Sequence, residues 1–326
     1  MHLNAFHMEF IQKKGLVHHP VWDNWLLITW VTISVIHFFI PLNGNIQITL
    51  FISIILLTGI PHGALDHLVE EKNNTKRNKT FSMFKFLGTY FLRMAVFALL
   101  WFFVPLLSLG IFLVLSAYHF GETDLAKLPF SGPVLTCLQI SYGLMVLSFI
   151  LLTHLQEVMP IINGLPQLSN HPFLLYVNEF RIVFLIVISS LTLGLGLFLY
   201  AKDQRKDGPT YLSFCIQLIC VLWLIVSLPL TLSFTFYFGC WHSLHALNNI
   251  RHHLSDHPLR PLSWGVMMRK SLPFSLAACL MIAMLVIWAG NTYNAPVMMM
   301  GFFIGIAILT APHLEIMSKM QRDLDK

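Results

Sequence analysis

The sequence predicts an all-α, polytopic transmembrane protein in which about ten helices form a single integral-membrane domain over residues 1–326. Hydrophobic residues make up 56% of the chain and charged residues only 11%, and the mean hydropathy is +0.70. A soluble globular protein has about 25% charged residues, so this composition excludes a soluble enzyme. The spacing of long apolar runs and the positions of the basic residues support the same fold class.

The expected helices are apolar runs close to the roughly 20 residues that cross a bilayer. The fourth run is short, and Pro105 separates it from the third. The stretch 154–178 contains Pro and Gly, which interrupt a spanning helix between the fifth and sixth runs. The runs are 22–41, 46–67, 83–104, 106–121, 132–153, 178–200, 210–229, 231–250, 272–290 and 296–315.

The basic residues predict the orientation of these helices. All of the 20 Lys and Arg residues except Arg93 and Arg181 lie in the N-terminal arm, in the even-numbered loops or in the C-terminal tail. Because cytoplasmic loops collect Lys and Arg, we expect both termini in the cytoplasm and the protein in the cell membrane. The net charge of +5 is therefore a topology signal and does not indicate nucleic-acid binding.

Four histidine-containing clusters end even-numbered helices and so are expected at one face of the membrane. They are PHGALDH (61–67), YHFGETD (118–124), WHSLH (241–245) and PHLE (312–315). Ionisable groups are costly in a bilayer and usually face the protein interior or a cavity. A lone intramembrane histidine is more often a packing residue, but four clusters at one depth favour a common site.

Several neutral imidazoles without thiolates suit a redox-active first-row metal. Carboxylates near such histidines often accept the second ring N–H. On a continuous helix, Asp66 would share a face with His62 at i+4, and Glu122 lies at i+3 from His119. His242 and His245 are also i and i+3, whereas His67 is either a further ligand or a polar donor.

Two other classes of function remain open on the residues alone. A di-iron lipid hydroxylase or desaturase uses histidine boxes, of which His242-x-x-His245 followed by His252-His253 is only a loose version. A histidine-lined proton or metal transporter would place its site near the bilayer midplane, in related halves that this sequence does not display. The absence of an H-E-x-x-H motif argues against a zinc protease.

The motifs PHGALDH, YHFGETD, WHSLH and the terminal APH resemble those of the Brp/Blh family of β-carotene 15,15′-dioxygenases. The resemblance spans the second to the tenth expected helix. It implies an Fe(2+) centre held by His62, His119 and His242, with no catalytic residue beyond the metal ligands. It also implies O₂-dependent cleavage of the central 15,15′ double bond of all-trans β-carotene to two all-trans retinal, and a functional link to a microbial rhodopsin.

The family pattern often has a second histidine four residues after the one in the eighth helix, where this chain has Ala246. His245 is one position earlier, and His313 follows Pro312 at the end of the tenth helix. Of these two candidates for a fourth ligand we favour His245, because the family's ligand pair lies on the eighth helix.

The predicted topology is tested by reporter fusions at Thr75 and Leu165. We expect the two reporters on opposite sides of the membrane, because an odd number of expected helices separates them. Reporters on the same side would contradict the helix count.

Overall fold

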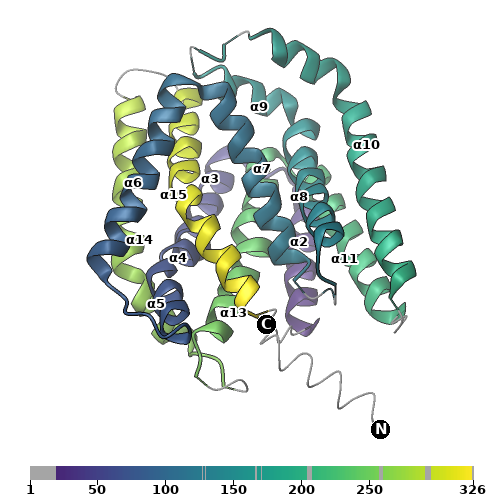
Figure 1. Ribbon diagram of the computed structural model, residues 1–326. Helices are drawn as coiled ribbons and strands as arrows, with labels where there is room; N and C mark the ends of the chain where they lie inside the picture. The colour runs from purple at the N-terminus through teal and green to yellow at the C-terminus, as the bar shows by residue number, and fades with distance from the viewer. Residues whose placement is uncertain are drawn as a thin grey trace. The chain divides into compact units, whose positions relative to one another are not determined.

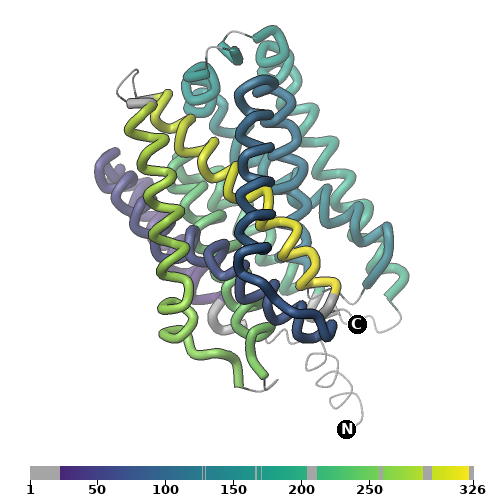
Figure 2. Tube along the Cα trace, turned by 60° about the vertical axis from the view of Figure 1, so that its left-hand side comes forward, coloured from purple at the N-terminus to yellow at the C-terminus, as the bar shows by residue number. Residues whose placement is uncertain are grey.

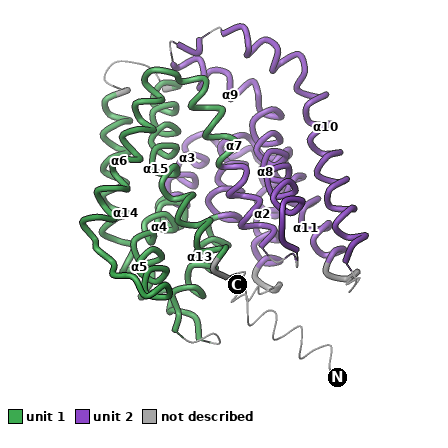
Figure 3. Tube along the Cα trace, in the orientation of Figure 1, with its two compact units in different colours: residues 1–19, 56–115, 243–326 green, residues 20–55, 116–242 purple. Residues whose placement is uncertain are grey.

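The computed structural model describes residues 20–126, 128, 130–165, 167–169, 171–203, 208–256, 260–290 and 295–324. Within these residues every regular element is a helix, as expected (Figure 1). The described chain divides into two compact units, which Figure 3 colours separately. Unit 1 comprises residues 56–115 and 243–326, and unit 2 comprises residues 20–55 and 116–242. The single integral-membrane domain stays a prediction.

Seven helices of the described chain are long and apolar enough to cross a membrane, as in a multi-pass membrane protein. They are Gly44–Lys76, Met83–Phe103, Pro105–Asp124, Pro133–Thr153, Pro172–Lys202, Trp264–Trp288 and Pro296–Arg322. Two shorter apolar helices are Asp23–Phe39 and Tyr211–Ser227. The number of ten spans and the cytoplasmic termini stay predictions, and the arm that contains Lys13 and Lys14 lies outside the described residues.

Unit 1 is built around three long helices that lie side by side. Helix α15 packs along α14 and α6 and also contacts α5 (Figures 1 and 2). The elements of this unit are most of η1 (Ile55–Gly59), α4 (Ile60–Gly63), α5 (Asp66–Lys76), α6 (Met83–Phe103), the first half of α7 (Pro105–Asp124), α13 (Ser243–His253), α14 (Trp264–Gly290) and α15 (Ala295–Leu324).

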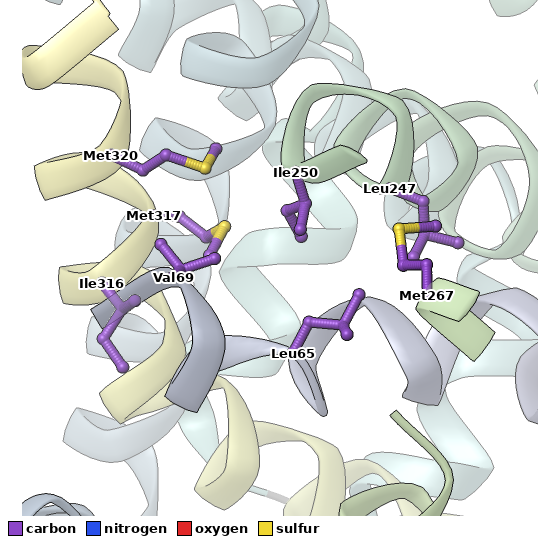
Figure 4. Packing of buried hydrophobic residues seen from close by; sticks show 8 residues of the cluster. All are labelled: Leu65, Val69, Leu247, Ile250, Met267, Ile316, Met317 and Met320. Atoms are coloured by element: carbon purple, nitrogen blue, oxygen red, sulfur yellow. The ribbon is translucent and has the colours of Figure 1, made fainter. Parts of the chain in front are cut away.

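A cluster of buried apolar side chains holds α15 to α5 and α13 within unit 1 (Figure 4). These side chains are at most 2% exposed, so each makes many dispersion contacts that are individually small. Leu65 of the cluster directly precedes Asp66 in the chain, and Ile316 is three residues after His313. The cluster therefore fixes the two helices that carry Asp66 and His313. Its members are Leu65, Val69, Leu247, Ile250, Met267, Ile316, Met317 and Met320.

In unit 2, α8 packs against α10 and α11. Helix α10 exposes many large apolar side chains, among them Leu175, Phe180 and Ile186, as a lipid-facing helix does. The elements of this unit are α2 (Pro20–Phe39), α3 (Gly44–Ile54), the second half of α7, α8 (Pro133–Thr153), α9 (Leu155–Ile162), α10 (Pro172–Lys202), α11 (Gly208–Ser227), α12 (Leu230–Phe234) and η2 (Thr235–His242).

Local sequence signals explain where several helices start. Helices α7, α8 and α10 begin with a proline, whose fixed φ and missing N–H suit the first helical position. The side chain of Asn43 accepts a hydrogen bond of 2.9 Å from the Ile46 N–H and so caps α3. At α12 the Glu157 carboxylate accepts the Leu230 N–H at 3.2 and 3.3 Å, which satisfies a donor freed by the break at Pro229.

Two of the expected helices differ from the continuous α-helices that the hydropathy predicts. The run 46–67 consists of α3, the π-helical η1, α4 and α5, with a turn at Ala64 and Leu65. The run 231–250 likewise consists of α12, the π-helical η2 and α13. One π-helix ends three residues before His62 and the other ends at His242, in keeping with the enrichment of π-helical turns at functional sites.

Helices α7 and α8 touch through their backbones in unit 2, and two glycines permit this contact. A Cβ atom on Gly121 would lie 1.9 Å from the Gln139 carbonyl oxygen, and one on Gly143 would lie 1.8 Å from the Ala117 carbonyl oxygen. Gly121 lies within α7, which continues to Asp124 beyond the expected boundary at residue 121. Small residues commonly allow such close approach between membrane helices.

The substitution Gly121→Ala should destabilise the protein by about 3 kcal/mol or more, because α7 must move away from rigid backbone. Gly110→Ala on the same helix is the matched control, since its Cβ would meet nothing within 4 Å. We expect the control to change the free energy of unfolding by less than about 1 kcal/mol. Thermal unfolding in detergent measures the stability of each variant relative to the wild type. Equal stability of the two variants would refute the backbone contact.

Candidate metal centre

Unit 1 buries two histidines side by side. His62 lies on α4, one residue before its end, and His313 lies on α15 beside Pro312. Their side chains are 5% and 3% exposed, and the ring centroids are 5.0 Å apart with the planes at 76°. His313, the alternative to His245, thus contacts His62 in this unit.

The carboxylate of Asp66 orients His313. The His313 Nδ1–H donates to Asp66 Oδ1 at 2.7 Å, and the Tyr90 hydroxyl donates to Asp66 Oδ2 at 2.9 Å. With the ring proton on Nδ1, the lone pair of a neutral His313 is on Nε2, which is the arrangement of a carboxylate-oriented metal ligand. The expected i+4 relation between His62 and Asp66 does not hold, because the turn at Ala64 and Leu65 interrupts the helix.

An ion pair links the long helices α6 and α15 of unit 1. Arg93 on α6 lies 2.8 Å from Glu315 Oε2 on α15, and Lys319 lies 2.7 Å from Glu315 Oε1. Arg93 is one of the two basic residues that lie inside an expected helix and not in a loop, arm or tail. Its partner Glu315 is two residues after His313, so this ion pair helps to hold α15 in register with α6.

Unit 2 buries a second histidine pair with almost the same geometry. His119 on α7 and His242 at the end of η2 have ring centroids 4.7 Å apart and planes at 76°. The rings of Phe120 and Phe238 lie 4.5 and 6.3 Å from the His242 ring, centroid to centroid. This aromatic surrounding shields His242 from water, and the residue is 0% exposed.

The remaining sequence-predicted residues have other environments. Glu122 is 5% exposed and accepts a hydrogen bond of 2.9 Å from the Tyr118 hydroxyl on the preceding turn. The His67 ring packs on Phe274, with centroids 4.3 Å apart. His245 is buried on α13 with 6% exposure.

Sequence reasoning missed the tyrosines whose hydroxyls donate hydrogen bonds to Asp66 and Asp124. Tyr90 donates to Asp66, and Tyr142 and Tyr237 both donate to Asp124. None of these tyrosines lies within a histidine motif, so no spacing signal connects them to the site. Asp124, in contrast, ends the motif YHFGETD and could have been noticed as a third acidic residue near the histidines.

The donor chemistry of these residues fits a metal. His62, His119 and His313 are each buried and are of a type that could hold a metal ion. Imidazole nitrogen binds iron, copper and zinc alike, so these residues alone do not distinguish the metal.

The fold and these histidine pairs define a class of protein, a helical membrane protein in which imidazoles that could hold a metal are buried among apolar helices. The family model described as Beta-carotene 15,15'-dioxygenase matches residues 53–321, a range that contains all four histidine motifs. The chain therefore belongs to this family of enzymes, which confirms the resemblance of the motifs. The transporter and lipid hydroxylase alternatives are not supported by this match.

A curated relative agrees with this assignment. The chain is 25% identical over 275 residues to the "Beta-carotene 15,15'-dioxygenase" of an uncultured marine bacterium, 66A03. The aligned region covers 81% of this chain and 90% of the relative. No solved structure matches the chain.

Proposed function

We propose that the protein cleaves the central 15,15′ double bond of all-trans β-carotene with O₂ to give two molecules of all-trans retinal. The observation that carries the proposal is the burial of a histidine pair in each unit at the motifs on which the family resemblance rests. The reaction balances when each aldehyde product receives one oxygen atom of O₂. The name of the marine bacterial relative supports the same substrate class.

Fe(2+) is the proposed cofactor, as the family resemblance implies. When bound, it would supply the electrons that activate O₂ for reaction with the hydrocarbon. Neutral imidazoles fit this ion, because they bind first-row metals in the +2 state and leave coordination positions for other ligands. The protein's own contribution would be to orient these imidazoles and to shield them from water.

The proposed ligands shared with the family motifs are His62, His119 and His242, and their assignment to one ion follows from that resemblance. For the fourth position we now propose His313 rather than His245. The bond between His313 and Asp66 supports this choice, because it holds the ring with Nε2 as the ligand atom. Asp66 would then orient His313, and the Tyr90 hydroxyl would hold Asp66 in place. The Glu122 carboxylate is proposed as a further orienting group.

The substrate is a long apolar polyene that dissolves in the bilayer, so an intramembrane enzyme can take it directly from lipid. Aromatic surfaces such as Phe120 and Phe238, next to His242, suit contact with such a molecule. We further propose that the protein lies in the cell membrane with both termini in the cytoplasm. Its retinal would serve a microbial rhodopsin, which needs this aldehyde as chromophore.

Co-expression with a β-carotene pathway tests the activity. We expect loss of the orange pigment and formation of retinal, measured by chromatography of extracted cells. The His62→Ala variant is the control and should leave β-carotene intact at a similar protein level. Persistent β-carotene beside folded, iron-loaded wild-type protein would overturn the proposed function.

The fourth ligand is tested by comparing His313→Ala with His245→Ala. We expect His313→Ala to lower iron affinity by more than the roughly 10–100-fold typical of losing an outer-shell group, and to abolish retinal formation. His245→Ala should retain iron, and its burial on α13 makes it a matched control for loss of a buried ring. Iron per folded protein, measured by elemental analysis, decides between them.

Two outcomes would contradict this assignment. Loss of iron in His245→Ala but not in His313→Ala would restore the ligand set that the family pattern favours. Full retention of iron in both variants would indicate a centre with three histidines.

A further inference from the structure

A half-buried carboxylate in unit 2 connects the two elements that carry the second histidine pair. Asp124 ends α7, five residues after His119. Its Oδ2 accepts one hydrogen bond from the Tyr237 hydroxyl on η2 at 2.9 Å and another from the Tyr142 hydroxyl on α8 at 3.0 Å. Both tyrosines are buried, at 0% and 3% exposure. One oxygen atom thus joins three elements, of which η2 lies far from α7 and α8 in sequence.

The hydrogen bond between Tyr237 and Asp124 holds η2, the segment that ends in His242. Tyr237 and His242 are separated by five residues on the π-helix η2, which is the spacing of one π-helical hydrogen bond. Phe120, the residue after His119, packs on both rings: its centroid is 5.2 Å from that of Tyr237 and 4.5 Å from that of His242. A shift of Tyr237 would therefore move the contact surface against which the His242 ring is held.

The bond to Tyr142 acts on a different interface. Tyr142 precedes Gly143, one of the two glycines at which the backbones of α7 and α8 touch. That contact already fixes α7 on α8, so the Tyr142 hydroxyl adds to an interface that is tight without it. The two tyrosines donate to the same oxygen at nearly the same distance, yet only Tyr237 shares an element with a histidine of the pair.

We propose that Asp124 is a positioning residue, which acts through Tyr237 to set the orientation of His242 relative to His119 for metal binding. The inference rests on the proposed metal centre and deepens it. Asp124 acts by holding, through Tyr237, the element on which His242 lies. The alternative is that Asp124 only satisfies two buried hydroxyls and contributes to stability alone.

The experiment compares Tyr237→Phe with Tyr142→Phe in the full-length protein in detergent. Each change removes one hydroxyl that donates to Asp124 Oδ2 and keeps the ring, so both variants should fold and lose similar thermal stability. The probe is Co²⁺ added to metal-free protein, because its visible d–d absorption reports on ligand geometry. We expect Tyr237→Phe to weaken Co²⁺ binding roughly tenfold and to shift the absorption bands. Tyr142→Phe should keep the wild-type affinity within about threefold and the wild-type spectrum.

A further control is Tyr211→Phe, which removes a Tyr–Asp bond of the same length, 2.9 Å to Asp203, at the connection of α10 and α11. It should leave the Co²⁺ spectrum unchanged. Equal effects of Tyr237→Phe and Tyr142→Phe on affinity and spectrum, or no effect of either, would overturn the positioning role while leaving the proposed function intact. Failure of the wild-type protein to bind Co²⁺ or Fe²⁺ would overturn both.

Discussion

A carboxylate buried among apolar helices is costly unless hydrogen bonds replace the water that it has lost. Each unit contains a carboxylate that has lost water, the buried Asp66 in unit 1 and the half-buried Asp124 in unit 2, and each accepts hydrogen bonds from hydroxyl or imidazole donors on other elements. Because these donors come from elements distant in sequence, satisfying the carboxylate also fixes how the elements pack. The orientation of the histidines depends on this requirement.

The two units meet the requirement in different ways. In unit 1 the carboxylate binds a candidate ligand directly, since Asp66 accepts the Nδ1–H of His313. In unit 2 the carboxylate binds tyrosines, and the aromatic ring of Phe120 connects Tyr237 to His242. Both devices limit the rotation of an imidazole before any metal arrives, so less conformational entropy is lost when a metal binds.

Much of the fold could be predicted because hydropathy is a local property of the chain. Most of each of the ten apolar runs lies in helices, and the interruption expected in 154–178 contains the short helix α9 and the first turns of α10. Hydropathy could not reveal the π-helical segments η1 and η2, because a change of helical pitch leaves the composition of a run unchanged. It also could not show that Gly121 lies within a helix, where its missing side chain serves a backbone contact with α8.

The sequence by itself determined the membrane class, the histidine motifs and the family, since these depend on composition and on residues close together in the chain. Only the tertiary structure decided which side chains meet. His313 lies 247 positions from Asp66, and Tyr237 lies 113 positions from Asp124, yet each pair forms a hydrogen bond. No periodicity relates residues so far apart, and helical spacing instead suggested Asp66 as the partner of His62. The donors that reach Asp66 and Asp124 are brought there by the packing of whole helices, which is a property of the folded chain.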